Sequence, residues 1–189
     1  MNCKPDKITQ MAARFLKQAN GKLPYIILVK MMYYADKQML IQYGEPITFD
    51  RWVSMKHGPV LSVTLNFIRS PEECATQDWL SHMSTHGYDI ELKGDPGDGA
   101  LSELEIEVID EVFNELKDPS GEYSKEFVFG VVDHTHLLPE WDENTANGGS
   151  TDITYGEVLR LAGVSKEMVA EILGDIGANE YNPMLLKAA

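Results

Sequence analysis

The sequence predicts a mainly α-helical α+β protein in which a helical core is joined by a small antiparallel β-hairpin or sheet. Three observations predict this class. Apolar residues recur at helical spacing along residues 4–19, and residues 24–43 are apolar almost throughout. Residues 47–55 and 88–92 have the composition and the alternation typical of strands. With 189 residues, 43% of them hydrophobic, the chain has enough apolar side chains for one core.

The first two helices follow from spacing and from their end signals. In residues 4–19 the apolar side chains lie at i, i+3, i+4, i+7, i+8 and i+11, which places them on one helix face. Gly21 follows this segment and suits a helix end, because glycine adopts positive φ without strain. Pro24 suits the first turn of a second helix over residues 24–43, where its missing N–H has no partner to lose.

The second helix is predicted to be central, because its polar edge, at Lys30 and Lys37, is narrow. Asp36 nevertheless falls within its apolar surface at 100° per residue. A buried carboxylate is costly unless it is paired and hydrogen-bonded, and Arg51 and His57 are the nearest partners along the chain. We therefore expect Asp36 to make a structural bond that ties this helix to the turn that follows it.

A hairpin or strand pair is expected after the second helix. Residues 47–55 are rich in Thr, Phe, Trp and Val, and Asp50 stands where a tight turn can reverse the chain. Gly58 and Pro59 then end the extended run, since glycine supplies backbone freedom and proline fixes φ. A brief third helix is predicted over residues 60–69.

The second half of the chain is read from the same signals. A loop is predicted at 70–77, then a strand with Tyr88, Ile90 and Leu92 on its buried face, and a glycine-rich connector at 94–99. A capping box of Ser102 and Glu105 opens a helix that runs to Leu116, and a further helix runs from Ser124 to about His134. A loop at 144–150 and a cap at Thr154 and Glu157 precede two short helices at 158–161 and 168–173.

Charge is distributed unevenly. The formal net charge is −14, which disfavours binding to nucleic acid and to anionic membranes. Residues 1–60 nevertheless hold nine Lys or Arg against four Asp or Glu, so most of the acidic residues lie in residues 61–189. That acidic part is suited to a basic partner, such as a toxin that handles RNA or a nucleotide, or it is a solubilising surface.

The two cysteines, Cys3 and Cys74, are far apart and lack CxxC spacing, which argues against a disulfide framework and a thiolate metal site. Residues 1–10 contain no apolar core typical of secretion, and no apolar run approaches the roughly 18 residues that cross a bilayer. We expect a soluble protein of the cytoplasm.

Catalytic motifs are weak. His134 with His136, or His82 with His86, places two imidazoles near each other, but neither pair contains the glutamate of an H-E-x-x-H zinc site. There is no G-x-S-x-G nucleophile elbow. We expect neither catalysis nor a metal or other cofactor, and Trp52 and Trp141 are either core residues or interface anchors.

Residues 30–60, KMMYYADKQMLIQYGEPITFDRWVSMKHGPV, resemble the core of the Panacea domain of SocA-like antitoxins, a family often associated with phages. A helix starting near Leu101 and the stretch Tyr123–Trp141 match the same pattern. The resemblance spans roughly residues 5–142, with an insertion at about 72–98. It implies a Panacea-like domain over residues 1–142 and a C-terminal helical extension over 143–189 that packs on it.

The resemblance implies a protein that binds and neutralises a cognate toxin. Neutralisation is either by direct blockade or by acting as an adaptor that delivers the toxin to an ATP-dependent protease. The alternatives are a metal-dependent hydrolase that uses His134 and His136, and a phage-derived regulatory protein that touches DNA. The residues expected to bind the partner or to define the core are Asp36, Arg51, Trp52, His57, Gly58, Pro59, His134 and Trp141.

Overall fold

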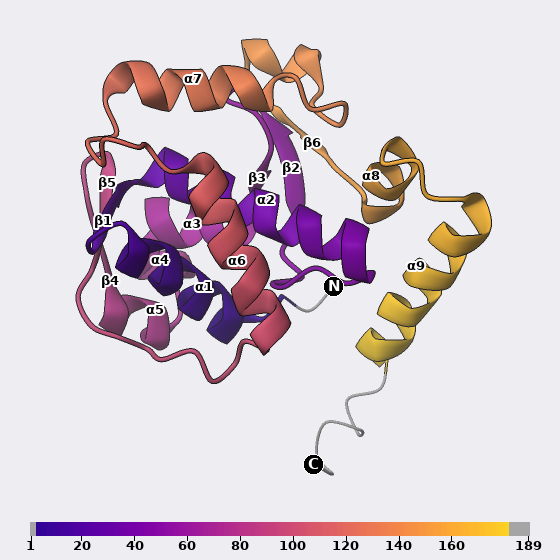
Figure 1. Ribbon diagram of the computed structural model, residues 1–189, viewed down its shortest axis with the longest axis horizontal. Helices are drawn as coiled ribbons and strands as arrows, with labels where there is room; N and C mark the ends of the chain where they lie inside the picture. The colour runs from indigo at the N-terminus through magenta and orange to yellow at the C-terminus, as the bar shows by residue number, and fades with distance from the viewer. Residues whose placement is uncertain (1–2, 182–189) are drawn as a thin grey trace.

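The computed structural model describes residues 3–181 and shows helices packed around one central helix, with two small sheets at the periphery (Figure 1). Helix α1 (Pro5–Gln18) and helix α2 (Tyr25–Tyr43) confirm the two predicted N-terminal helices. Pro24 is not in the first turn of α2 as predicted. It ends strand β1 (Lys22–Pro24), because this segment is extended and pairs with a later strand.

Helix α2 is the core of the molecule, as its sequence predicted. It contacts α1 and helix α6 (Glu103–Leu116) on one side and helix α7 (Lys125–Thr135) on another. Its buried side chains run from Ile27 to Leu40 and include both Lys30 and Asp36. The buried lysine was not predicted, because a lysine is almost never fully buried unless it is paired.

One sheet contains the predicted hairpin. Strands β2 (Trp52–Met55) and β3 (Val60–Leu61) pair antiparallel, and β6 (Ser150–Asp152) pairs with the other edge of β2, in the order β3-β2-β6. The predicted reversal at Asp50 is wrong, since the chain reverses between Met55 and Val60.

Asp50 instead caps the next helix, α3 (Ser62–Arg69). Its carboxylate accepts hydrogen bonds from Val63 N and Thr64 N, both at 2.8 Å, and from the Thr64 hydroxyl at 2.9 Å. These amides belong to the first turn, where the helix leaves N–H groups without an internal partner. Asp50 is therefore a remote capping residue.

Residues 70–77 are not a plain loop. They contain α4 (Pro71–Cys74), and α5 (Gln77–His82) begins at the end of this range. Trp79 of α5 is buried against Phe67, with ring centroids 5.5 Å apart. The helical period could not be recognised here because neither helix exceeds two turns.

A second sheet lies on the opposite side of the molecule in the order β1-β5-β4. It contains β4 (Met83–His86) and β5 (Asp89–Leu92), which form a tight antiparallel pair. The predicted strand at 88–92 is confirmed through Ile90, which is fully buried. Tyr88 does not share that buried face, because it precedes β5 and is exposed, stacked on Tyr25.

The C-terminal part confirms most of the predicted caps. Ser102 and Glu105 form the capping box of α6, and Ser124 and Thr154 cap the helices that follow them. The predicted loop at 144–150 contains a 3-10 helix and the start of β6. The last elements are η1 (Glu143–Asn147), α8 (Tyr155–Leu161) and α9 (Lys166–Tyr181).

The segment after residue 142 is joined to the core. Strand β6 extends the hairpin sheet, and Tyr155 of α8 packs edge to face against Trp52 with ring centroids 4.8 Å apart. The Tyr155 hydroxyl also donates to Asp50 O at 3.1 Å. Figure 1 shows α9 projecting from the end of the body where α2 terminates. Within residues 3–181, no helix is both long enough and apolar enough to cross a membrane.

Candidate functional site

The turn from Met55 to Pro59 brings three elements together. Gly58 donates its N–H to Met55 O at 2.9 Å and has a φ of +89°, a conformation that strains any residue with a Cβ. A Cβ at this position would also lie 2.2 Å from Thr135 Oγ1 and 2.8 Å from Lys30 Nζ. Glycine is therefore required twice, once by the backbone and once by the close approach of α7 and α2.

Lys30 fixes this turn from the interior. Its side chain is fully buried, and Nζ donates to Pro59 O at 2.9 Å. Burial lowers the pKa of the Lys30 ammonium to about 7. The Lys30 ammonium has no charged partner, since it donates to a carbonyl and no ion pair joins it to a carboxylate of the described residues. Lys30 is thus the anchor that holds the turn on α2.

Trp141 and His136 fix the same turn from outside. The Trp141 indole donates to Met55 O at 3.0 Å, and the His136 ring stacks on it with centroids 4.0 Å apart. His136 Nε2 lies 3.2 Å from Lys56 O. The structure therefore brings three of the expected site residues together, because the turn carries His57 and Gly58 and the Trp141 indole holds it.

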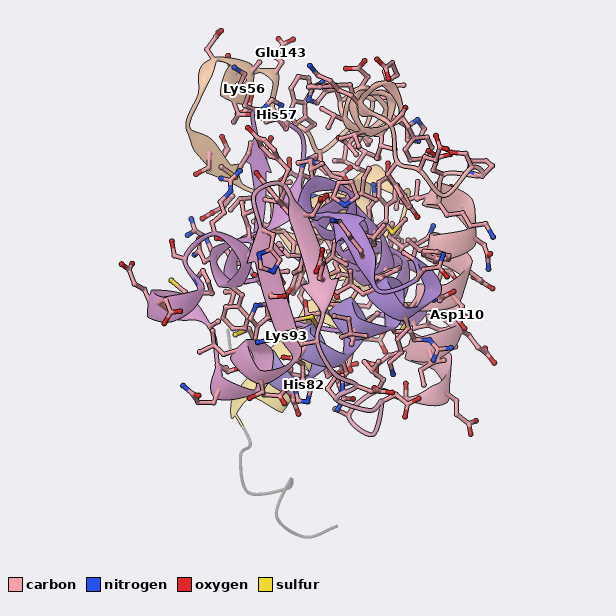
Figure 2. The ribbon with its side chains drawn as sticks, turned by 90° about the vertical axis from the view of Figure 1, so that its left-hand side faces the viewer. Lys56, His57, His82, Lys93, Asp110 and Glu143 are labelled. Carbon is pink, nitrogen blue, oxygen red and sulfur yellow. The ribbon has the colours of Figure 1, made fainter. Side chains whose placement is uncertain are left out.

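The outer surface of the turn carries one exposed ammonium and one exposed imidazole. Lys56 and His57 are exposed, and Figure 2 shows them at one end of the molecule with Glu143 of η1 nearby. The pKa of His57 is lowered by partial burial and by the neighbouring cations Lys56 and Lys30. A neutral His57 is therefore the favoured form at neutral pH.

Asp36 makes the predicted kind of bond with different partners. Its carboxylate accepts from Thr48 N at 2.9 Å, from the Thr48 hydroxyl at 2.5 Å and from the Trp52 indole at 3.3 Å. The predicted partners are wrong. His57 is exposed on the turn, and Arg51 is exposed and forms an ion pair with Asp152.

The reason is local geometry. Thr48 follows α2 closely and offers both an amide and a hydroxyl, so one small residue satisfies a carboxylate without burying a second charge. Burial raises the pKa of Asp36 to about 7, although the bonds from Thr48 oppose the shift. Trp52 is a core residue that packs edge to face on Tyr33 with centroids 5.3 Å apart.

A buried polar cluster next to α7 was not predicted. Glu140 Oε1 accepts from the Tyr33 hydroxyl at 2.8 Å and from Lys37 Nζ at 2.6 Å. Glu140 Oε2 and the neighbouring Tyr34 hydroxyl are buried without a hydrogen-bond partner among the described residues. The sequence signal was the spacing of Tyr33 and Lys37, one helical turn apart on an otherwise apolar helix.

A groove separates the C-terminal end of α6 from α7. Its volume is about 410 Å³, and His134 lies in its wall. The His134 ring stacks on Tyr34 with centroids 6.5 Å apart, so Tyr34 lies directly behind that wall. The lining residues are Glu115, Leu116, Lys117, Pro119, Phe127, Gly130, Val131 and His134.

The two histidines proposed for a metal site lie apart in their contacts. His134 stacks on Tyr34, whereas His136 stacks on Trp141, because residues two apart on a helix point to nearly opposite sides. Among the described residues no group of three or more His, Cys, Asp or Glu is arranged to hold a metal ion. The geometry therefore offers no support for the hydrolase alternative.

Most of the basic residues in residues 1–60 form ion pairs with acidic residues from the rest of the chain. Six of the nine bases in residues 1–60 form ion pairs with acids beyond residue 60, so little of that basic character is left for an external partner. The pairs are Lys7–Glu105, Arg14–Asp110, Lys17–Asp95, Lys22–Asp89 and Glu91, Lys37–Glu140, and Arg51–Asp152.

Comparison with known proteins gives one match. The family model described as antitoxin SocA-like, Panacea domain, matches residues 28–142, which is more than half of the chain. The matched segment runs from the start of α2 to the residue after Trp141 and so contains the turn, the polar cluster and the groove. No curated protein and no solved structure matched the chain.

Proposed function

Because the chain belongs to the family of SocA-like antitoxins with a Panacea domain, we propose that it binds a cognate toxin protein and neutralises it without catalysing a reaction. The proposal places this activity in the cytoplasm. It also takes residues 1–142 as the antitoxin domain, with an insertion at about 72–98, and residues 143–189 as an extension packed on it.

The observation that supports a protein partner is the incomplete burial of α7. Only Val132 and Thr135 of this helix are buried, although its sequence, KEFVFGVVDHT, is mostly apolar. Phe129 is 48% exposed, and Leu137, just beyond the helix, is 79% exposed. A helix with apolar side chains on its solvent side is typical of a surface that another protein covers. Direct blockade by this surface is the simplest mechanism.

The test is co-expression with the protein encoded by the adjacent gene. We expect that protein to arrest growth when expressed alone, growth to be restored when this chain is present, and the two to elute together in size-exclusion chromatography. Equal toxin levels with and without this chain would indicate blockade, whereas a fall that depends on an ATP-dependent protease would indicate an adaptor. Absence of both rescue and complex would overturn the proposal.

A matched pair of variants tests whether α7 makes the contact. Phe129→Gln removes a ring that is 48% exposed on α7, and Tyr43→Gln removes one that is 49% exposed at the end of α2. Glutamine is a good helix former, so neither change should unfold the chain. We expect the first variant to lose rescue and the second to keep it.

A further inference from the structure

The α6–α7 groove has features that define the chemistry of a guest. Leu116, Phe127 and Val131 give it an apolar lining. Gly130 also lines it and is exposed, and no described heavy atom lies within 4 Å of its Cβ position, so a larger side chain has space there. The volume of about 410 Å³ is within the range of pockets that enclose a ligand. The groove is therefore able to take apolar side chains.

The surroundings of the groove hold more acids than bases. Three acids are Glu115 in the lining and Glu126 and Asp133, which are exposed on α7. The lining also holds one base, Lys117, whose ammonium donates to Asn114 Oδ1. None of the three acids forms an ion pair with a base of the described residues, unlike the acids that pair with residues 1–60. Across residues 111–140 there are seven Asp or Glu and two Lys. This surface attracts a positively charged partner.

Buried polar atoms beside the groove lead to the same conclusion. The Tyr34 hydroxyl has no partner among the described residues, and its pKa is raised to about 12 by burial and by the carboxylates of Glu140 and Glu115. Glu140 Oε2 is likewise unpartnered. The Tyr34 hydroxyl, on the ring that stacks on His134, and Glu140 Oε2, whose carboxylate pairs with Lys37 through Oε1, thus keep unused acceptor capacity, and oxygen acceptors suit the N–H groups of Arg or Lys.

We propose that the α6–α7 groove binds a segment of the partner in which apolar side chains are flanked by Arg or Lys. This inference rests on the proposed function, because it takes the toxin as the source of the segment. A second copy of this chain is a poor occupant, since each copy has a net charge of −14 and most bases of residues 1–60 are already paired. The apolar lining likewise disfavours a polar small molecule.

The test uses a variant that fills the groove without weakening the helix. Gly130→Leu places a side chain in the groove and replaces glycine with a better helix former. Gly174→Leu makes the same change in α9, where the Cβ position also has no described heavy atom within 4 Å. Glu115→Lys reverses a charge at the border, and Glu171→Lys does so on α9.

The probe is a short fluorescent amphipathic peptide of leucine and lysine, compared with one of the same pattern made of leucine and glutamate. We expect the lysine peptide to bind the unmodified chain more tightly. Gly130→Leu should weaken its binding by about tenfold or more, and Glu115→Lys by a few fold in a salt-dependent manner. Gly174→Leu and Glu171→Lys should bind like the unmodified chain. Equal binding to both peptides, or binding unchanged by Gly130→Leu, would overturn the inference.

The two proposals fail separately. If the co-expressed toxin forms a complex that is equally stable with Gly130→Leu, the toxin is bound elsewhere and the groove inference is wrong while the antitoxin function stands. If the lysine peptide binds in the groove but this chain does not restore the growth of cells that express the toxin, the antitoxin function is wrong while the ligand preference of the groove stands.

Discussion

Substituting Gly58 by alanine tests the packing of the turn against α2 and α7. Gly58 has φ +89° and Gly21 has φ +91°, so an added Cβ meets nearly the same backbone strain at either position. Their surroundings differ, because the Cβ at Gly21 has no heavy atom within 4 Å whereas the one at Gly58 would lie 2.2 Å from Thr135 Oγ1. Gly21→Ala is therefore a control for strain alone.

The expected magnitudes follow from these contacts. Gly21→Ala should cost about 1–2 kcal/mol of unfolding free energy for the strained backbone. Gly58→Ala should cost that amount, about 1–3 kcal/mol more for overpacking, and about 1–2 kcal/mol for a weakened hydrogen bond from Lys30 Nζ to Pro59 O. The two variants should therefore differ by about 2–5 kcal/mol.

Urea unfolding followed by circular dichroism measures this difference. With an m-value of about 2 kcal/mol/M, the midpoints should be separated by about 1–2.5 M. Thr135→Ala removes Oγ1 but leaves Cβ, which lies 3.0 Å from the added Cβ, so combining it with Gly58→Ala should recover only about 1 kcal/mol. Equal losses in Gly58→Ala and Gly21→Ala would refute the argument that α7 packs directly on the turn.

Three further outcomes are expected in urea unfolding. Asp36→Ala should cost about 3 kcal/mol, because buried donors lose their acceptor, whereas Arg51→Ala, which breaks an exposed ion pair, should cost less than about 1 kcal/mol. Glu140→Ala should cost about 2–4 kcal/mol, since the buried Tyr33 phenol and the partly buried Lys37 ammonium lose their partner. Stability should fall from about pH 4 to pH 7, because folded Asp36, with its pKa raised to about 7, retains a proton that the unfolded chain loses. Stability should rise from about pH 7 to pH 10, because the pKa of Lys30 is lowered in the folded protein, so the unfolded chain binds the extra proton in this range. Asp36→Asn should remove the fall below pH 7, and Lys30→Met should remove the rise above it.

The sequence predicted the elements whose signals are local and long. The helices at residues 5–18, 25–43 and 103–116 were recognised because each presents several turns of periodic apolar residues or a complete capping box. Short elements were missed because their residue patterns repeat too few times to be recognised. Strands β1 and β6 have three residues each, and both depend on a partner strand that is distant along the chain.

The buried polar residues show why hydrogen-bond partners are hard to predict from sequence. Asp36 was correctly expected to be buried and bonded to the segment after α2, but its partner is Thr48, a neutral residue that charge complementarity does not select. Lys30 was assigned to a polar edge because sequence alone does not show that a carbonyl of the turn meets its ammonium. Glu140 was missed since its role depends on a separation of 103 residues from Lys37.

Under the proposed function, the arrangement of α7 gives the turn a role in binding that needs no contact between the turn and the partner. Thr135 packs on Gly58, and His134, one residue earlier, lies in the groove wall. Adjacent residues on a helix are about 100° apart, so one side of α7 is fixed by the turn while the next side forms the groove. A change in the turn that displaces Thr135 therefore moves the groove wall as well. The glycine and proline of the KHGPV segment are then required to position α7, and the surface that meets the partner is free to be α7 itself.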